Sequence, residues 1–219
     1  MHFEILVEDA SGKIALESIL EKILGPNVQD HTYRIIPYKG VGRIPKDLRG
    51  TTDPRKRILL DRLPQLLKGY GKAHRDFPAA VVVVVDLDDK ECMVFKQEML
   101  NILYNCNPQP TTLFRIAIEE CEAWLLGDHN AVKAAYPRAK KQILNAYEQD
   151  SICGTWEKLA DAVYPGGSQK LKQMGWPHTG QAKCEWAKNI APHLDVDINQ
   201  SKSFKVFRDG IRNLAGIES

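Results

Sequence analysis

The sequence predicts an α/β fold, a doubly wound and mainly parallel sheet with a C-terminal helical extension. Strand-like and helix-like patterns alternate over residues 1–128, as expected when helices cross over between the strands of one sheet. Ala79–Val85 is wholly apolar and contains five consecutive valines, which is typical of a central parallel strand covered on both faces. Only helical patterns follow. We therefore expect an α/β domain over 1–128 and a helical extension over 129–219 packed on it.

In the first half of the chain, four short apolar segments are interpreted as strands, at 3–7, 33–38, 79–85 and 113–118. The first helix follows Ser11, a candidate N-cap, and its apolar positions repeat at the spacing of one helix face: Leu16, Ile19, Leu20, Ile23 and Leu24. Similar spacing predicts helices over 59–70 and 92–103, and the glycines and prolines of 39–54 predict a long loop.

In the second half, Asp128 is a candidate N-cap for a short helix that ends before Pro137. Further helices are expected over 155–164, from Thr179 as N-cap toward residue 193, and over 204–214. Glycines at 166–167 and 175 are expected to mark loops.

Composition excludes several classes of protein. The longest apolar run has seven residues, far below the roughly 20 that a membrane-spanning helix needs. The N-terminus lacks a signal-peptide pattern, and the five cysteines form no C-x-x-C pair, so we expect a cytoplasmic protein without disulfides or a zinc site. The chain also lacks a G-x-x-x-x-G-K-[ST] phosphate loop, so it is not expected to hydrolyse nucleoside triphosphates by itself.

Acidic side chains follow three of the predicted strands. Glu8 follows the first, Asp86, Asp88 and Asp89 follow the valine strand, and Glu119, Glu120 and Glu122 follow the fourth. Because parallel strands end at the same edge of a sheet, these carboxylates are expected to converge there. Carboxylates brought together repel one another, and a hard divalent ion with oxygen ligands relieves that repulsion. The sequence therefore predicts one or two Mg²⁺ or Mn²⁺ ions, although an Asp-x-Asp segment alone is also common in turns and caps.

A basic stretch runs from Arg43 to Arg62 and carries seven Lys or Arg residues, although the formal net charge of the chain is only +2. Beside an acidic metal site, such a stretch fits the binding of a polyanion, whereas a solvated surface is the simpler explanation for any one basic run. We expect its first six basic residues to hold a nucleic-acid backbone: Arg43, Lys46, Arg49, Arg55, Lys56 and Arg57.

The residues that carry these features resemble the toprim domain. Val7–Gly12 resembles its first motif, with the Glu after the first strand, and Val85–Asp88 resembles its Asp-x-Asp motif. Ile118–Asp128 is similar to the Glu-Ala-Trp-Leu-Leu signature of uncharacterised toprim-like proteins near OLD-type nucleases, which are often found beside ATPases in phage-defence clusters. The resemblance covers roughly residues 1–128. It departs at Asp9, where the family usually has Gly; Asp9 either adds a metal ligand or shapes the turn.

The resemblance implies a metal-dependent nuclease, acting on nucleic acid as the effector of an antiviral defence system with a separate ATPase. In that family role, Glu8, Asp86 and Asp88 would hold the metal. On the following helix, Glu119 and Glu122 are three apart and are expected to share a face, so either would complete a second metal position; Glu122 is favoured because it lies in the signature. Glu120 is expected to point elsewhere, and Glu122→Gln is expected to leave folding nearly unaffected. By resemblance, Lys183 is the candidate for stabilising charge on the phosphate; Lys170 is the competing residue.

Two other functions stay open. A manganese-dependent nucleotide-sugar transferase would use Asp86 and Asp88 but gives Glu8 no task, and a degenerate toprim module would serve as a non-catalytic regulatory or scaffold subunit. The sequence does not choose between DNA and RNA, identify the ATPase or fix the oligomeric state, and homo-oligomerisation stays open.

Overall fold

The computed structural model describes residues 1–25, 30–49, 53, 55–151 and 153–217. Residues 50–52 and 54 of the expected basic loop lie outside this part. The strands are β1 (His2–Val7), β2 (Thr32–Pro37), β3 (Ala79–Asp86) and β4 (Thr112–Ala117). The helices are α1 (Ala10–Leu24), α2 (Leu59–Ala73), α3 (Cys92–Tyr104), α4 (Glu122–Leu126), α5 (His129–Ala135), α6 (Lys141–Asn145), α7 (Thr155–Val163), α8 (Gly167–Met174), α9 (Trp176–Ile190) and α10 (Lys202–Ala215), with a 3₁₀ turn at Ala191–His193.

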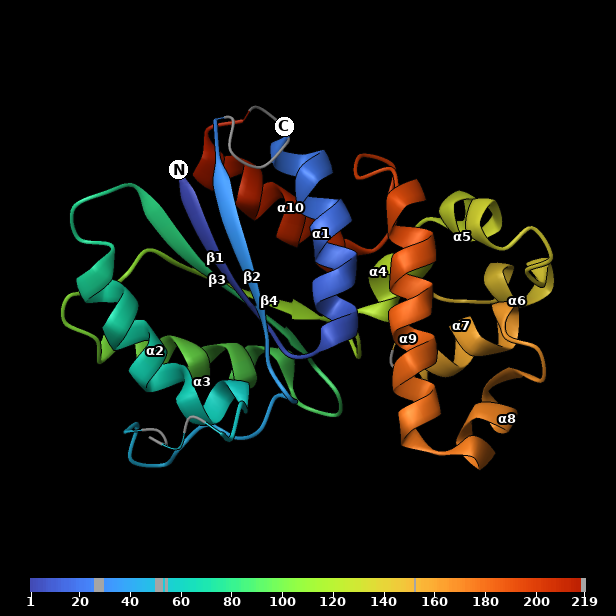
Figure 1. Cartoon of the computed structure of the whole chain (residues 1–219), viewed down its shortest axis with the longest axis horizontal. Coiled ribbons are helices and arrows are strands. Elements are labelled where there is room, and N and C mark those ends of the chain that lie inside the picture. Colours follow the sequence, from blue (N-terminus) through green and yellow to red (C-terminus); the bar gives the residue numbers. More distant parts are fainter. Residues whose placement is uncertain (26–29, 50–52, 54, 152, 218–219) are drawn as a thin grey trace.

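The four strands form a parallel sheet in the order β2-β1-β3-β4 (Figure 1), which confirms the predicted α/β, doubly wound fold. The valine strand β3 lies inside the sheet and is buried on both faces. Val81, Val83 and Val85 pack in one cluster with residues of α2 and α3. Val82 and Val84 pack in a second cluster with residues of α1 and α10. Helices therefore cover both faces, as the continuous apolar run of β3 requires.

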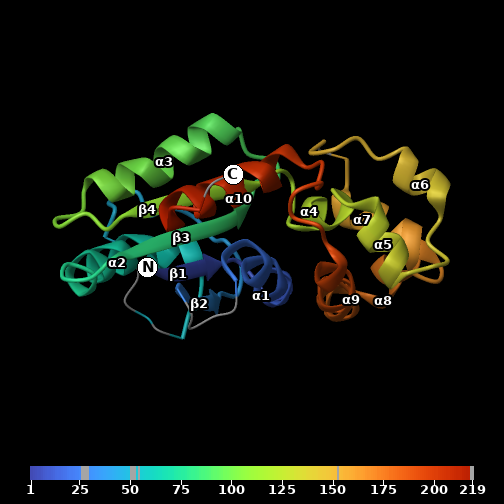
Figure 2. The same ribbon diagram turned by 90° about the horizontal axis from the view of Figure 1, so that it is seen from above.

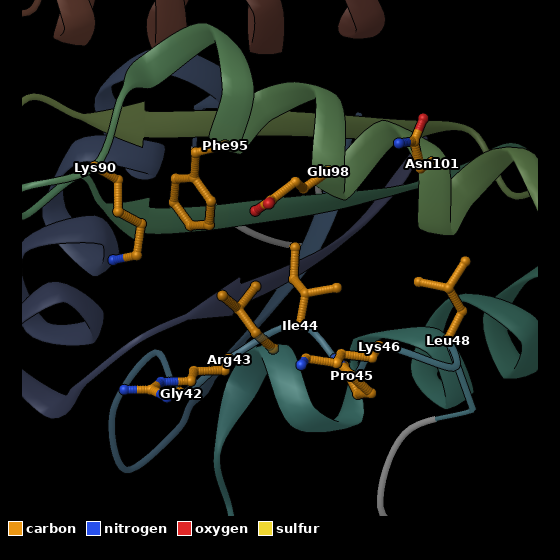
Figure 3. Close-up of a pocket in the computed structure, with 11 residues that line it drawn as sticks. Gly42, Arg43, Ile44, Pro45, Lys46, Leu48, Lys90, Phe95, Glu98 and Asn101 are labelled. Carbon is orange, nitrogen blue, oxygen red and sulfur yellow. The ribbon is translucent and has the colours of Figure 1, made fainter.

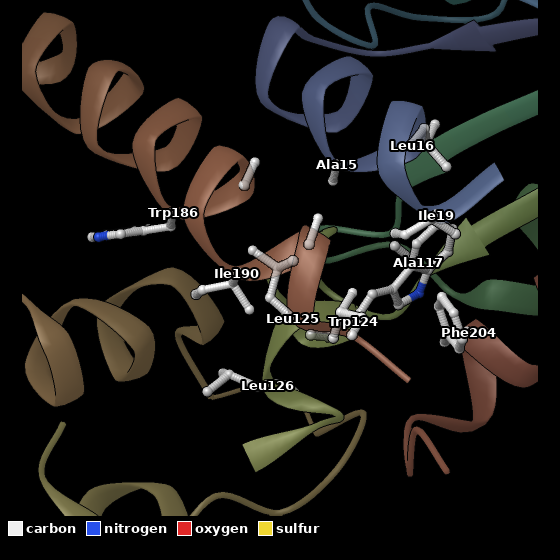
Figure 4. Packing of buried hydrophobic residues seen from close by; sticks show 14 of the residues in the cluster. Ala15, Leu16, Ile19, Ala117, Trp124, Leu125, Leu126, Trp186, Ile190 and Phe204 are labelled. Atoms are coloured by element: carbon white, nitrogen blue, oxygen red, sulfur yellow. The ribbon is translucent and has the colours of Figure 1, made fainter. Parts of the chain in front are cut away.

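The helices from α4 to α9 gather beyond the end of the sheet toward which the strands point, and α10 returns to pack against β4 and α1 (Figures 1 and 2). The short helix α4 joins these parts. Its Trp124 stacks on Phe207 of α10 with ring centroids 4.9 Å apart. Its Leu125 lies in the same apolar cluster as Leu16 of α1 and Ile190 of α9 (Figure 4). The segment that follows β4 is thus fixed by packing on several sides.

Several helix starts differ from expectation, while Asp128 caps α5 as predicted. The N-cap of α1 is Asp9 rather than Ser11, and Asp9 accepts hydrogen bonds from the Gly12 amide and the Ser11 hydroxyl. Gly166 and Gly175 mark junctions between helices rather than loops. Both have positive φ, which glycine adopts readily, so the chain turns sharply into α8 and α9 there. Thr179 consequently lies inside α9 and does not cap it.

Among the described residues, no helix is long and apolar enough to cross a membrane.

Candidate functional site

Glu8 and Asp86 lie side by side at the carboxyl edge of the sheet. β1 and β3 are parallel neighbours in which Val7 is opposite Val84, so Glu8 and Asp86 leave the sheet at nearly the same level. The Asp86 backbone amide donates a hydrogen bond to Glu8 Oε2 at 3.3 Å. The two strand ends that the sequence places at one edge are therefore in direct contact.

The segment after β4 comes to the same place. Asp86 Oδ1 accepts a hydrogen bond from the Cys121 amide at 3.0 Å. The Leu87 and Asp88 amides donate to the carbonyls of Ala117 and Glu119, which continues the pairing of β3 and β4 beyond the sheet. These contacts fix the loop before α4 against Asp86, and so bring the third acidic segment to the carboxylate pair.

Burial and neighbouring negative charges both raise the pKa values of Glu8 and Asp86. Burial raises the pKa of Glu8 to about 7, and the negative charges of Asp88 and Asp9 add to this effect. Burial also raises the Asp86 pKa well above its ordinary range, with a further contribution from the charge of Glu8. A cation at this point would favour the ionised form of both groups.

One cation is built into the edge. Lys183 of α9 has a side chain only 12% exposed, and its Nζ lies 3.1 Å from Glu122 Oε2 and 3.6 Å from Glu120 Oε1. Burial by itself would lower the Lys183 pKa, but the charges of Glu122, Glu120 and Asp86 outweigh it and raise that pKa. Burial raises the pKa of Glu122, while Lys183 opposes the rise. We call Glu8, Asp86, Glu120, Glu122 and Lys183 the edge cluster.

The prediction for Glu120 was wrong. This residue was expected to point away from the site, but it faces Lys183, and its Oε2 also accepts a hydrogen bond from the Trp156 amide at 3.1 Å. Burial and the charge of Glu122 raise the Glu120 pKa to about 7. The reason is local geometry. Residues 119–121 form a turn before α4 rather than its first helical turn, so helical spacing does not describe their directions.

The prediction that Glu119 shares a helix face with Glu122 was also wrong. Glu119 precedes α4 and has a φ of 61°. Its carboxylate accepts hydrogen bonds from the backbone amides of Cys153, Gly154 and Thr155 and from the Thr155 hydroxyl. Although burial acts in the opposite direction, these hydrogen bonds lower the Glu119 pKa. The carboxylate thus holds the start of α7, and its oxygens are already occupied by donors.

Asp88 lies at the exposed margin of the edge cluster. It has a φ of 50°, and its Oδ2 lies 3.2 Å from Lys90 Nζ. Beside it is an acidic hollow of about 240 Å³, lined by Asp88, Asp89, Glu119, Glu120, Gly154, Trp156 and Glu157. Asp88 therefore faces solvent and Lys90, whereas Asp86 faces the interior of the edge.

Within the described parts of the chain, no group of three or more His, Cys, Asp or Glu side chains is close enough together to hold a metal ion. Mg²⁺, however, keeps several waters and commonly uses only one or two protein carboxylates together with substrate phosphates. Glu8 and Asp86 supply two such carboxylates. Glu122 Oε2 is buried and, apart from its ion pair with Lys183, makes no hydrogen bond to any described residue. The donor chemistry fits a hydrated divalent ion, although the side chains do not form a closed cage.

The loop that leads into the basic stretch begins next to Glu8, where the Gly40 amide donates to the Glu8 carbonyl at 3.0 Å. All six of its predicted phosphate-binding side chains are exposed: Arg43, Lys46, Arg49, Arg55, Lys56 and Arg57. Arg57 donates to the Pro37 carbonyl, which attaches the far end of the loop to the end of β2. Of the two candidate lysines, Lys170 is exposed on α8, and only Lys183 lies in the edge cluster.

Sequence reasoning missed the part played by α9 in the edge cluster. Lys183 was chosen by resemblance alone, and no spacing in the sequence links it to Glu120 or Glu122. The capping role of Glu119 was missed as well, because its partners at 153–155 follow far along the chain.

A comparison with protein-family models gives one match, described as "Domain of unknown function (DUF4276)", over residues 7–212. The chain belongs to the DUF4276 family. The matched range contains the whole edge cluster, the basic stretch and most of α10, so in this DUF4276 protein strands β2 to β4 and the helices beyond the sheet belong to one family unit. Neither the curated proteins nor the solved structures that were searched include a match.

The first prediction concerns Glu119 as a structural group in the DUF4276 fold. Because its pKa is lowered on folding, its contribution to stability is full above the unfolded value of about 4.5 and is lost as pH falls through the folded value. Glu119→Gln should lower the free energy of unfolding at pH 7 by about 1–3 kcal/mol, and the difference should shrink below about pH 4. Denaturant unfolding across pH measures this. Glu185→Gln, an exposed control on α9, should change stability by less than about 0.5 kcal/mol.

The second prediction concerns the buried ion pair. The earlier expectation that Glu122→Gln leaves folding nearly unaffected does not hold physically, because the change leaves Lys183 buried without its nearest carboxylate. Glu122→Gln and Lys183→Met should each lower the free energy of unfolding by about 3–5 kcal/mol, and the double variant should lose clearly less than the sum.

The exposed pair Lys13–Glu17 on α1 is the control, with an Nζ–Oε1 distance of 3.5 Å. In the corresponding double-mutant cycle, its coupling should be about 0.2–1 kcal/mol. If the coupling energy of the Lys183–Glu122 cycle is as small as that of the control pair, the buried ion pair does not hold the edge cluster together.

Proposed function

We propose that this DUF4276 protein is a divalent-metal-dependent nuclease that hydrolyses phosphodiester bonds in nucleic acid. The observation that carries the proposal is the hydrogen bond from the Asp86 backbone amide to the Glu8 carboxylate. It holds acidic residues of two adjacent parallel strands together at the edge where ligands bind in open α/β sheets. The toprim-like sequence motifs around these residues support the same reading.

In this proposal, Glu8 and Asp86 hold Mg²⁺ or Mn²⁺, with Asp88 beside them on the solvent side and Glu122 on the inner side. When bound, such an ion lowers the pKa of its water and neutralises charge on the scissile phosphate. The protein's own contribution is to keep the two carboxylates in place. Hydrogen bonds from the Asp86 amide to Glu8 and from the Cys121 amide to Asp86 do this.

Lys183 acts in the proposal mainly as a positioning residue. Its ammonium lies between Glu120 and Glu122, so it lowers the repulsion among the carboxylates and fixes the direction of Glu122. The resemblance assigns it a direct contact with the phosphate. The contacts with two glutamates favour the positioning role, because an ammonium held by two carboxylates is less free to reach a substrate phosphate.

The exposed basic side chains from Arg43 to Arg57 are proposed to bind the phosphate backbone beside the edge cluster. This electrostatic binding should weaken with salt, with a slope of about −0.7 to −0.9 for each neutralised phosphate. A cytoplasmic location is proposed from the cysteine pattern of the sequence, and a separate ATPase partner and a role in antiviral defence are proposed from the resemblance.

A second candidate function is a non-catalytic toprim-like regulatory or scaffold module. It is favoured by one observation, the buried Lys183, which already supplies the edge cluster with a cation. The third candidate, the nucleotide-sugar transferase, requires Asp86 and Asp88 to act together. In the structure Asp86 contacts Glu8, whereas Asp88 pairs with Lys90, so the contacts favour the nuclease over the transferase.

The third prediction separates these functions. Asp86→Asn should abolish the rise in melting temperature that Mn²⁺ causes in the wild type, and it should lower the cleavage rate at least about 100-fold, because the ion supplies several kcal/mol of charge stabilisation. Thermal unfolding with and without Mn²⁺, and cleavage of labelled single- and double-stranded DNA and RNA, measure the two effects.

Asp89→Asn is the matched control, since Asp89 is exposed in the same loop, and it should behave like the wild type in both assays. Mn²⁺ binding without cleavage of any substrate would favour the scaffold module. Cleavage that survives Asp86→Asn would refute the proposed site.

A further inference from the structure

A second concave site lies beside the edge cluster, between the basic loop and α3 (Figure 3). It is a pocket of about 420 Å³, within the range of small-ligand sites. One wall is the segment Gly42–Leu48, and the opposite wall is formed by Phe95, Glu98 and Asn101 of α3.

The loop wall is held in place by its own hydrogen bonds. The Leu59 and Leu60 amides at the start of α2 donate to the carbonyls of Gly40 and Val41, and the Arg43 amide donates to Asp61 Oδ1 at 3.0 Å. The loop is thereby anchored to α2 on one side of the pocket.

The lining combines two chemistries. Three cationic side chains belong to it, Arg43, Lys46 and Lys90, and Figure 3 shows Lys90 and Arg43 toward the same end of the pocket. Its apolar lining comes from Ile44, Leu48, Leu60 and Phe95. A simple anion would interact only with the cationic side chains, and an apolar molecule only with the apolar ones. A ligand that suits both has a negatively charged group joined to an apolar one.

The remaining polar groups narrow the ligand further. Glu98 of α3 faces the same space and supplies a carboxylate that accepts hydrogen bonds from amino groups, whereas the amide oxygen of Asn101 accepts a hydrogen bond from Gln97. Lys90 Nζ lies 4.9 Å from the Phe95 ring centroid, so a cation already sits over that aromatic side chain. The same Lys90 pairs with Asp88, which connects the pocket to the margin of the edge cluster.

We propose that this pocket binds one nucleotide, with its phosphate at Arg43, Lys46 and Lys90 and its base against the apolar lining. The nucleotide is either free or one unit of a bound strand. In the second case the inference rests on the proposed function and deepens it, because the pocket then fixes one nucleotide of the substrate next to the carboxylates.

The test measures binding in buffer with a chelator, so that it is independent of metal and cleavage. The probes are adenosine 5′-monophosphate, adenosine, inorganic phosphate and a single-stranded oligodeoxyadenylate, titrated by calorimetry into the full chain. We expect the mononucleotide to bind with a Kd of about 1 mM or tighter, and adenosine and phosphate to bind at least tenfold more weakly. If only the oligonucleotide binds, the nucleotide belongs to a strand.

The variant Lys46→Glu should weaken nucleotide or oligonucleotide binding at least tenfold. Its matched control is Lys96→Glu, which makes the same change of charge at an exposed position of α3 outside the pocket, and which should leave the affinity within about twofold. Melting temperatures verify that both variants fold.

Three results would overturn the inference: equal losses in the two variants, phosphate binding as tight as that of the nucleotide, or no binding of any probe. The outcome is separable from the proposed function. If the protein cleaves nucleic acid with Mg²⁺ but its Lys46→Glu and Lys96→Glu variants bind the nucleotide equally well, the pocket proposal fails and the nuclease proposal stands. If the nucleotide binds selectively but no nucleic acid is cleaved, the pocket proposal stands and the nuclease proposal fails.

Discussion

The arrangement of this protein depends on how four carboxylates are kept together at one edge of a parallel sheet. Glu8 and Asp86 are brought there by the strands, and Glu120 and Glu122 by the turn and short helix after β4. Ionised carboxylates at such distances repel one another, and burial makes each charge more costly. The Lys183 ammonium offsets part of this repulsion, because it lies 3.1 Å from Glu122 and 3.6 Å from Glu120. It leaves the Glu8–Asp86 contact without an equally close ammonium or guanidinium group among the described residues.

The same lysine explains why the helices beyond the sheet belong to the site. Lys183 stands on α9, and α9 packs along α1, the helix that follows Glu8. The apolar cluster around Trp124 and Leu125 fixes α4 between these helices and α10, so the direction of Glu122 depends on packing from both halves of the chain. The DUF4276 match extends from residue 7 to residue 212, which agrees with a unit whose site needs both halves. On this view, removing the helices after α4 would expose the carboxylates and separate them from their cation.

Much of the fold follows from local pattern, and the details of the site do not. The run of valines at 81–85 predicts a central parallel strand because both of its faces are apolar, and this also places Glu8 and Asp86 at one edge. Glu119 shows where such reasoning stops. Its positive φ breaks the helical spacing assumed for 119–122, and its carboxylate binds amides at 153–155, which only the tertiary structure brings near. The glycines before α8 and α9 were expected to mark loops, but they lie at junctions between helices. Sequence alone does not separate the two, because a glycine with positive φ occurs in loops and at helix junctions alike.

The central claim is that Glu8 and Asp86 form the site of a divalent ion, and the most direct measurement is a crystal structure of the full chain soaked in Mn²⁺. The anomalous signal of manganese locates the ion without reference to activity. The account predicts a peak in contact with the Glu8 and Asp86 carboxylates, with Lys183 still between Glu120 and Glu122. Crystals that take up Mn²⁺ only elsewhere on the protein, while Glu8 and Asp86 keep their present contact, would contradict it.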